Sequence, residues 1–369
     1  MVDQCAPKSS PEEAMASKRP VVILGATGAV GQRFVSLLAK HPWFKIEVLA
    51  ASERSAGHRY AEACRWVVPG DPPTSVGGMI VQPLDPTQLG PSPSMPIAFS
   101  ALPASVAREV EPLFAQAGYA VCSNASAFRY DSDVPLLIPE VNVDHLTLIE
   151  RQRAKRNWPG FITTNPNCTI TGIAMVLKPL DTAFGVRRVF ATSMQAVSGA
   201  GYPGVASLDI LDNVVPYVTG EEEKVERETR LLLGRIVDEE RVEADIVVSA
   251  HANRVPVVDG HTICLSVGFE KAHTVHQAIA ALIDFRGPDQ VRSLPSAPEH
   301  PILVRHQPDR PQPRRDRDAE QGMAVTVGRM RPCPLLDLRM VVVVHNTLRG
   351  AANGSILNAE LLVAEGHVK

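Results

Sequence analysis

Apolar residues in the first half of the chain fall into short continuous runs with helix-like segments between them. The runs occupy residues 20–24, 46–51, 97–102, 119–123 and 161–164. Continuous apolar runs are expected of strands that are buried on both faces of a parallel sheet. Between them, helical spacing is seen at Val30, Phe34, Leu37 and Leu38 and again within 103–117. This alternation predicts a doubly wound α/β sheet.

The second half carries longer β-branched runs, and few helical segments separate the later ones. The runs occupy residues 188–196, 245–250, 262–269, 324–329 and 338–344, and residues 220–233 form a charged helical stretch. This pattern predicts an antiparallel-rich α+β domain. Because long exposed sheets commonly pair with a second copy of the chain, we expect a dimer interface here.

Domain boundaries are expected where these patterns change. An apolar helix ending near Leu362 is expected to return to the first sheet and complete it. We therefore expect a Rossmann-type nucleotide-binding domain of residues 20–165 and 346–369, and a catalytic and dimerisation domain of residues 166–345. Residues 1–19 are polar without a hydrophobic segment, which predicts a disordered lead-in rather than a secretory signal.

Composition narrows the class of protein. The 369 residues carry a formal charge of −3 with both signs interspersed, so the chain has neither a nucleic-acid footprint nor a polybasic membrane patch. Its longest apolar runs have the length of strands rather than of membrane spans. The six cysteines include no CxxC pair and fit neither a zinc site nor a disulfide framework. We expect a cytoplasmic protein without nucleic-acid, membrane or metal partners.

A glycine-rich loop joins the first predicted strand to the first predicted helix. Gly25 would permit a tight turn, Gly28 would let a pyrophosphate approach the backbone, and Gly31 would allow close helix packing. The spacing is GxxGxxG, and its place between a strand and a helix favours a dinucleotide site over a structural turn. The predicted cofactor contacts in this loop are Gly25, Thr27, Gly28, Ala29, Val30 and Gly31.

The residues after the second strand bear on the choice of dinucleotide. Glu53 could accept a ribose 2′-hydroxyl, as in NAD sites, whereas Arg54 between Ser52 and Ser55 suits the 2′-phosphate of NADP. We favour NADP.

A candidate nucleophile follows the strand at residues 161–164. Pro166 favours an extended Asn165, and Asn167 is a good N-cap, so Cys168 is expected in the first turn of a helix. The helix dipole and free N–H groups would lower the thiol pKa and produce a reactive thiolate. A buried cysteine that only packs is the alternative.

Two further places could supply partners for this thiol. Arg254 and His261 are joined by a turn at Asp259-Gly260 that could direct both side chains to one cavity. A histidine can serve the proton transfers of a thiol nucleophile, and an arginine can hold a carboxylate. Arg129 follows a strand at the edge where open α/β sheets bind ligands, although it could equally be a surface residue.

The arginine-rich residues 305–318 are expected to form a long surface loop whose charged side chains face solvent.

Taken together, the motifs resemble the aspartate-β-semialdehyde dehydrogenase family, in its fungal and archaeal branch. They are GATGAVGQ at 25–32, SNASAFR at 123–129, LIPEVN at 137–142, NPNCT at 165–169, SMQAVSGAG at 193–201, EEEK at 221–224, NRVPVVDGH at 253–261 and LRGAANGSILNAEL at 348–361. The order Cys168, Gln195, Arg254, His261 is more specific than any single motif.

The resemblance implies an NADP-dependent reduction of L-aspartyl 4-phosphate to L-aspartate 4-semialdehyde with release of phosphate, on the route to lysine, threonine and methionine. It implies that Cys168 is the nucleophile, His261 the general acid/base and Gln195 a residue that positions the intermediate. The implied substrate contacts are Arg254 for the carboxylate, Glu221 for the amino group, Arg129 and Lys224 for phosphate, and Asn167. The further implied cofactor contacts are Ser100, Ser198, Gly199 and Asn346. Members of the family are homodimers or homotetramers.

Other functions share part of this chemistry or of these motifs. A malonyl-CoA or succinyl-CoA reductase would use the same thiol and hydride chemistry on a thioester substrate. An N-acetylglutamyl-phosphate reductase is disfavoured because Glu221, three residues before Lys224, suits a free amine. Glyceraldehyde-phosphate dehydrogenase motifs match poorly. A cofactor-sensing regulator of the short-chain dehydrogenase type would need a Tyr-x-x-x-Lys pair, which the sequence lacks.

Overall fold

The computed structural model describes residues 18–89 and 97–368; most of the predicted lead-in and the last residue lie outside the described residues. The first half forms a five-stranded sheet in the order β2-β1-β3-β4-β5, in which every neighbouring pair is parallel. Its strands are β1 (Arg19–Leu24), β2 (Phe44–Ala50), β3 (Ile97–Ser100), β4 (Ala120–Ser123) and β5 (Phe161–Thr164). The sheet begins at Arg19, which pairs with Phe44 of β2.

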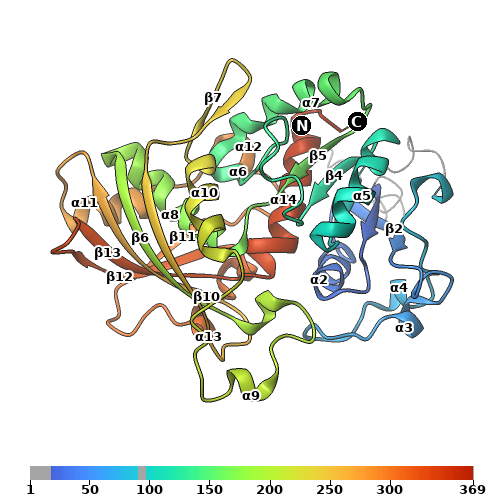
Figure 1. The fold of residues 1–369 in the computed structure, drawn as a ribbon, viewed down its shortest axis with the longest axis horizontal. Helices are drawn as coiled ribbons and strands as arrows, with labels where there is room; N and C mark the ends of the chain where they lie inside the picture. Colours follow the sequence, from blue (N-terminus) through green and yellow to red (C-terminus); the bar gives the residue numbers. More distant parts are fainter. Residues whose placement is uncertain (1–17, 90–96, 369) are drawn as a thin grey trace, which may run out of the picture.

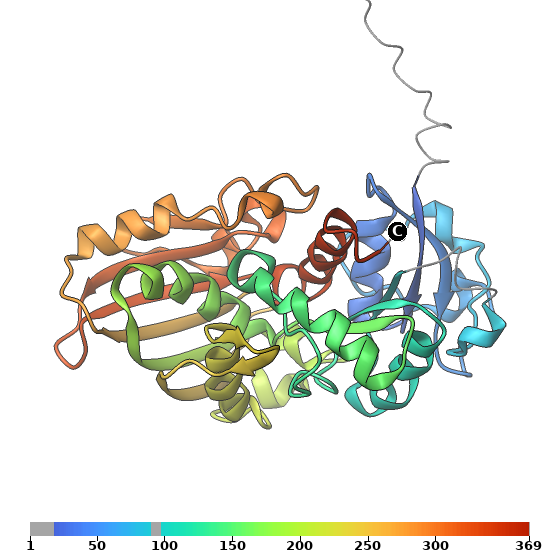
Figure 2. The ribbon, with the colours of Figure 1, turned by 90° about the horizontal axis from the view of Figure 1, so that it is seen from above.

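Helices cover both faces of this sheet, as the continuous apolar runs predicted (Figures 1 and 2). Val21 and Ile23 of β1 pack with α2 (Ala29–Leu38) and with the C-terminal helix α14 (Asn353–Ala364). Val22 and Leu24 point to the other face and pack with α5 (Ala104–Gln116). Both faces are therefore buried, and the doubly wound α/β prediction is confirmed.

The C-terminal segment returns to the first sheet, as predicted. It enters through a π-helical turn, η6 (Leu348–Ala352), and α14 then packs against β3 and β4. The turn also contacts both α2 and α8 (Cys168–Phe184), so it lies between the glycine-loop helix and the helix that begins with Cys168.

The second half forms a six-stranded sheet in the order β11-β12-β13-β10-β6-β9. The pairs β10–β13, β10–β6 and β12–β13 are antiparallel, while β6–β9 and β11–β12 are parallel, so the sheet is mixed but antiparallel-rich. Its strands are β6 (Val186–Gln195), β9 (Val247–Arg254), β10 (His261–Phe269), β11 (Ile302–Arg305), β12 (Val325–Pro332) and β13 (Leu338–Val344).

One face of this sheet is covered, and the other is largely open. Ile173 and Leu177 of α8 and Leu282 of α11 (Val275–Asp284) share one core with Ile263 of β10. On the opposite face, Phe190 is exposed, as are several alternating positions of β6 and β9. This half-covered sheet is the pattern expected of an antiparallel-rich sheet.

Shorter elements complete the described chain. They are α3 (Tyr60–Ala63), α4 (Thr74–Gly77), η1 (Pro86–Gln88), α6 (Pro139–Asn142), η3 (Val143–Thr147), α7 (Leu148–Arg156), η4 (Val197–Ala200), α9 (Ser207–Ile210), α10 (Glu221–Leu232), β7 (Arg235–Val237), β8 (Glu240–Val242), α12 (Asp289–Arg292), α13 (Pro313–Asp316) and η5 (Ala319–Gly322). The segment 305–318 is not simply a solvated surface, because Asp316 is buried and accepts hydrogen bonds from Arg305 and Arg310.

Candidate active site

Three strand ends bring different polar side chains to one edge of the six-stranded sheet. β6 and β9 run parallel, so Gln195 and Arg254 lie opposite each other at the carboxyl ends of these strands. β10 runs antiparallel to β6, so His261, its first residue, starts at the same edge. All three side chains are buried. The two strand directions therefore gather residues that are far apart in the sequence.

Cys168 meets this group from the amino end of α8. Asn167 caps the helix, because its Oδ1 accepts the Thr169 N–H at 2.9 Å, as the sequence predicted. The Cys168 Sγ lies 3.1 Å from His261 Nε2. Cys168 as a residue is partly exposed, while its neighbours Asn167 and Thr169 are buried.

His261 stands as a neutral hydrogen-bond donor toward the sulfur. Its Nδ1 accepts the backbone N–H of Ala196 at 3.0 Å, a pattern that assigns the ring hydrogen to Nε2, on the side of Cys168. Burial lowers the pKa of His261 to about 3, and the charge of Arg254 acts in the same direction. The imidazole is therefore neutral at pH 7.

The predicted low thiol pKa was wrong for the resting protein. Burial raises the pKa of Cys168 to about 12, and the Glu221 carboxylate raises it as well. The cations Arg129 and Arg254 act in the opposite direction without offsetting burial. The resting sulfur is thus a thiol beside a neutral imidazole, and its negative charge has to develop during the reaction.

Glu221, the first residue of α10, is an ionised carboxylate at the centre of the group. It accepts hydrogen bonds from Asn167 Nδ2 at 2.8–2.9 Å, from Gln195 Nε2 at 3.1 Å and from Lys224 Nζ at 3.0 Å. Burial by itself would raise the pKa of Glu221, but Lys224 and the two amide donors bring it below its usual value. Glu221 therefore links Asn167 at the start of α8, Gln195 at the end of β6 and the Lys224 ammonium group.

The second predicted phosphate ligand, Arg129, is paired with a residue that the sequence analysis missed. Its Nη1 donates to Glu228 Oε1 at 3.2 Å, and its Nη2 donates to the Asn124 carbonyl at 3.0 Å. Glu228 lies two turns after Glu221 on the same face of α10 as Lys224. This i, i+3, i+7 spacing is the sequence signal that could have identified Glu228.

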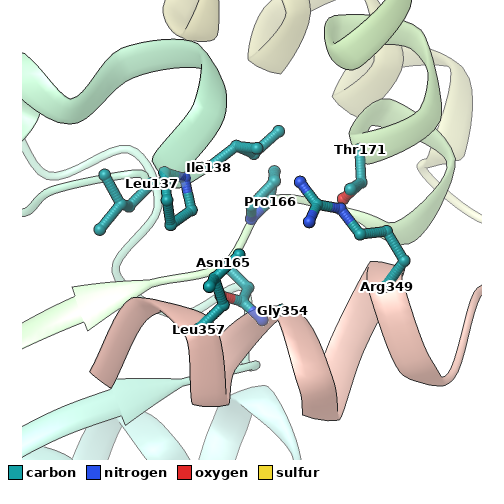
Figure 3. A pocket seen from close by; sticks show the side chains of 9 residues that line it. Leu137, Ile138, Asn165, Pro166, Thr171, Arg349, Gly354 and Leu357 are labelled. Atoms are coloured by element: carbon teal, nitrogen blue, oxygen red, sulfur yellow. The ribbon is translucent and has the colours of Figure 1, made fainter. Parts of the chain in front are cut away.

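The C-terminal segment packs against the turn before Cys168 and stabilises it. Asn165 Nδ2 donates to the Ala351 carbonyl at 2.8 Å, and Arg349 forms a bidentate ion pair with Glu140 at 2.7–2.8 Å. Figure 3 shows Asn165 and Pro166 between α8 and the C-terminal helix, with Arg349 beside them. The cavity left here is only about 10 Å³, room for about one water.

The glycine loop fits a bound dinucleotide. Gly25 has φ +80°, and a Cβ at Gly31 would stand 2.1 Å from the Gly25 carbonyl oxygen, so both roles predicted for these glycines hold. α2 begins at Ala29, and its N-cap Gly28 offers no side-chain cap. The N–H groups of Ala29 and Val30 are thus left for an anion, with Thr27 partly exposed beside them. This is the geometry that a pyrophosphate requires.

A cleft beside this loop has room for the rest of a nucleotide. Its volume is about 700 Å³, and Ser52, Glu53 and Arg54 line one side while Asp85 and Gln88 line another. Ser55 is buried and does not line this cleft.

The remaining predicted cofactor contacts separate into two groups. Ser198, Gly199 and Asn346 lie beside His261: Asn346 Nδ2 donates to Ser198 Oγ at 2.8 Å, and a Cβ at Gly199 would stand 3.1 Å from the imidazole Cε1. Asn346 Oδ1 also accepts the Gly260 N–H at 2.8 Å. Ser100, at the end of β3, is completely buried.

The sequence of this chain is similar to those of known proteins of one family. Residues 20–149 match the family described as semialdehyde dehydrogenase, NAD binding domain, and residues 177–349 match semialdehyde dehydrogenase, dimerisation domain. An aspartate-semialdehyde dehydrogenase of Archaeoglobus fulgidus is 52% identical over 345 residues, which is 94% of this chain and 98% of that protein. The chain belongs to the aspartate-semialdehyde dehydrogenase family.

Two further relatives bear on fold and substrate in this dehydrogenase family. The crystal structure of aspartate semialdehyde dehydrogenase with NADP from Candida albicans has a TM-score of 0.88 and 42% identity, and the match covers 95% of this chain and 100% of that one. A malonyl-CoA reductase (NADP) of Metallosphaera sedula is 43% identical over 351 residues, covering 94% and 97%. Relatives of similar identity thus carry different substrate names.

No group of three or more histidine, cysteine, aspartate or glutamate side chains in 18–89 and 97–368 is arranged to hold a metal ion. Across the same residues, no helix is both long and apolar enough to cross a membrane.

Proposed function

We propose that the enzyme uses NADPH to convert L-aspartyl 4-phosphate into L-aspartate 4-semialdehyde and phosphate through a thioester on Cys168. The observation that carries this proposal is the Cys168 Sγ, which lies 3.1 Å from His261 Nε2 and in the field of Arg129, Arg254 and Glu221. Lys224 is paired with that Glu221 carboxylate. A substrate with a carboxylate, an amine and a phosphate needs that combination of charges.

The sulfur forms and releases the covalent bond. It attacks the acyl carbon, the carbon–oxygen bond to phosphate breaks, and the thiol proton ends on the released phosphate. His261 donates its Nε2 hydrogen bond to the charge that develops on sulfur. As the tetrahedral intermediate collapses, the leaving sulfur takes that proton and His261 regains one from solvent, so His261 serves as the general acid. The backbone N–H of Cys168, at the start of α8, is a candidate donor to the oxyanion.

The charged side chains orient the substrate. Arg254 can bind the α-carboxylate through its forked guanidinium, and Glu221 can hold the ammonium group. Arg129 and Lys224 are the cations for phosphate, while Gln195 and Asn167 fix Glu221 from two sides. Nearly all of these groups are buried, which strengthens each interaction with the ligand.

The cofactor assignment is NADP. When bound, NADPH supplies the hydride that reduces the thioester. The glycine loop and the free amino end of α2 would hold its pyrophosphate, and Ser52 and Arg54 would hold its 2′-phosphate. Asn346 and Ser198 would lie at its nicotinamide end, next to His261.

The wider assignment follows from this chemistry. Residues 20–165 and 346–369 would bind the cofactor, while residues 166–345 would carry out catalysis and join copies of the chain into a homodimer or homotetramer. The product would serve lysine, threonine and methionine biosynthesis in the cytoplasm.

The second candidate is reduction of malonyl-CoA or succinyl-CoA, which the Metallosphaera sedula relative favours. The deciding experiment runs the purified enzyme in reverse, with aspartate semialdehyde, NADP and phosphate, and forward with NADPH and each acyl-CoA. We expect phosphate-dependent NADPH formation, which Cys168→Ser abolishes. Turnover of an acyl-CoA without phosphate-dependent activity would overturn the proposal in favour of the second candidate.

A further inference from the structure

A completely buried carboxylate lies between the nucleophile helix and the arginine proposed to bind phosphate. Glu228 Oε2 accepts the backbone N–H of Asn167 at 2.7 Å, directly before Cys168. Its Oε1 accepts from Arg129 Nη1 and from Tyr130 Oη, both at 3.2 Å. One side chain on α10 therefore joins two segments that follow β4 and β5, neighbouring strands of the five-stranded sheet.

These contacts require a carboxylate. All three partners of Glu228 donate hydrogens, and a carboxylate is a side chain that only accepts, with two oxygens. A glutamine in the same place could accept from one side but would turn its NH₂ group toward a donor on the other. An aspartate is one methylene shorter and would not reach both segments.

Arg129 is held on several sides but keeps hydrogen-bonding capacity for a ligand. Its Nη2 donates to Asn124, and Arg241 Nη1 donates to the Arg129 carbonyl at 2.9 Å. Its buried Nε has no hydrogen-bond partner among residues 18–89 and 97–368. The guanidinium is thus oriented before any ligand arrives, with a donor to spare.

We propose that Glu228 is a positioning residue for the phosphoryl group: it fixes Arg129 relative to the amino end of α8, and so relative to the Cys168 sulfur. This inference rests on the proposed phosphate chemistry. Since Glu228 acts through Arg129, its loss is expected to weaken phosphate binding much more than cofactor binding.

The test compares Glu228→Gln with Glu226→Gln in the phosphate-dependent reverse reaction. Glu226 lies on the same helix, and within the described part of the chain its carboxylate accepts one hydrogen bond, from the Ala250 N–H at 3.2 Å. We expect Glu228→Gln to raise the KM for phosphate by about tenfold or more, with the KM for NADP within about twofold. Glu226→Gln should leave both constants within about twofold. A fall in kcat alone, with the KM for phosphate unchanged, would overturn the inference.

A double variant covers the case in which Glu228→Gln does not fold because it leaves a buried arginine without its counter-ion. Arg129→Met together with Glu228→Gln removes both charges. Its KM for phosphate should equal that of Arg129→Met alone, because Glu228 then has nothing to position. A further rise of fivefold or more in the double variant would refute action through Arg129.

Thermal stabilisation by phosphate separates this inference from the proposed function. Binding to the folded state raises the melting temperature without any turnover. If the wild type does not catalyse the reaction, the proposed function fails, yet loss of phosphate stabilisation in Glu228→Gln would still support the positioning role. A wild type that phosphate does not stabilise, or a variant stabilised equally, would contradict it.

Discussion

The backbone of Gly350 lies directly against Cys168: a Cβ at position 350 would stand 2.6 Å from the Cys168 Cβ and 2.9 Å from its Cα. Real Cβ atoms do not approach other atoms this closely. The π-helical turn that carries Gly350 thus places the C-terminal segment against the nucleophile, and π-helical turns are frequent at functional sites.

This contact predicts that Gly350→Ala displaces the nucleophile. The added methyl group cannot fit unless Cys168 and the turn move apart, which changes the position of the sulfur, and we expect kcat to fall by about tenfold or more. Gly78→Ala is the matched control, because no atom lies within 4 Å of a Cβ there and its φ is not positive. Steady-state kinetics of both variants provide the measurement. Equal activity in Gly350→Ala and Gly78→Ala would show that the contact is unimportant.

The raised pKa of Cys168, about 12, predicts the pH dependence of its alkylation in the resting enzyme. Only the thiolate reacts rapidly, and its fraction increases with pH until the pKa is passed. Iodoacetamide modification of Cys168, followed by peptide mass spectrometry, should therefore accelerate steadily up to about pH 10. A rate that levels off near pH 7 would instead indicate a resting thiolate.

His261→Ala is expected to lower turnover by roughly 10²–10⁴-fold, the usual contribution of a general acid. Because burial keeps the pKa of His261 near 3, its titration should add no acid limb to the activity profile between pH 5 and 8 in the unliganded enzyme. The measurement is the pH profile of kcat/KM for wild type and variant. Unchanged turnover in His261→Ala would remove this residue from the mechanism.

Arg54→Ala should weaken NADPH much more than NADH, since the lost guanidinium is proposed to face the 2′-phosphate that only NADPH carries. We expect the KM for NADPH to rise about tenfold or more, and the KM for NADH to change by less than about threefold. Arg59→Ala removes the same charge from an exposed position that does not line the cleft. Equal losses for both cofactors would assign Arg54 another role.

His145 predicts an acid-dependent loss of stability. It is completely buried, and burial, followed by the charge of Arg241, lowers its pKa to about 3. Between the unfolded-state value of about 6.5 and this value, the unfolded chain binds a proton that the folded chain does not. The free energy of unfolding should therefore fall as the pH drops from 6.5 toward 3, by up to about 1.4 kcal/mol per pH unit for this group.

Chemical denaturation of His145→Leu and of the exposed-site control His276→Leu tests this prediction. The His145 variant should show a shallower dependence of unfolding free energy on pH than the wild type, and the His276 variant should not. Identical slopes in all three proteins would place the acid sensitivity elsewhere.

The local features of this protein could be predicted from the sequence because each depends on residues close to it in the chain. The continuous apolar run from Val21 to Leu24 predicted a strand buried on both faces. Gly25 and Gly31 predicted a tight turn with close packing, and Asn167 predicted the cap before Cys168. Each of these rests on backbone conformation or side-chain periodicity within a few residues.

The protonation states and side-chain contacts around the Cys168 sulfur depend on contacts between segments that are distant in the sequence. The protonation of Cys168 and of His261 is set by burial and by charges from β9 and α10, which no local pattern around residue 168 contains. The spacing along α10 could have marked Glu228 as facing the site, but its contact with the cap of α8 exists only in the folded chain. The sequence by itself thus determined the strands, the helices and the order of the chemical groups. Only the tertiary structure decided which groups are charged and which hold one another in place, because desolvation and pairing arise from the folding of remote elements together.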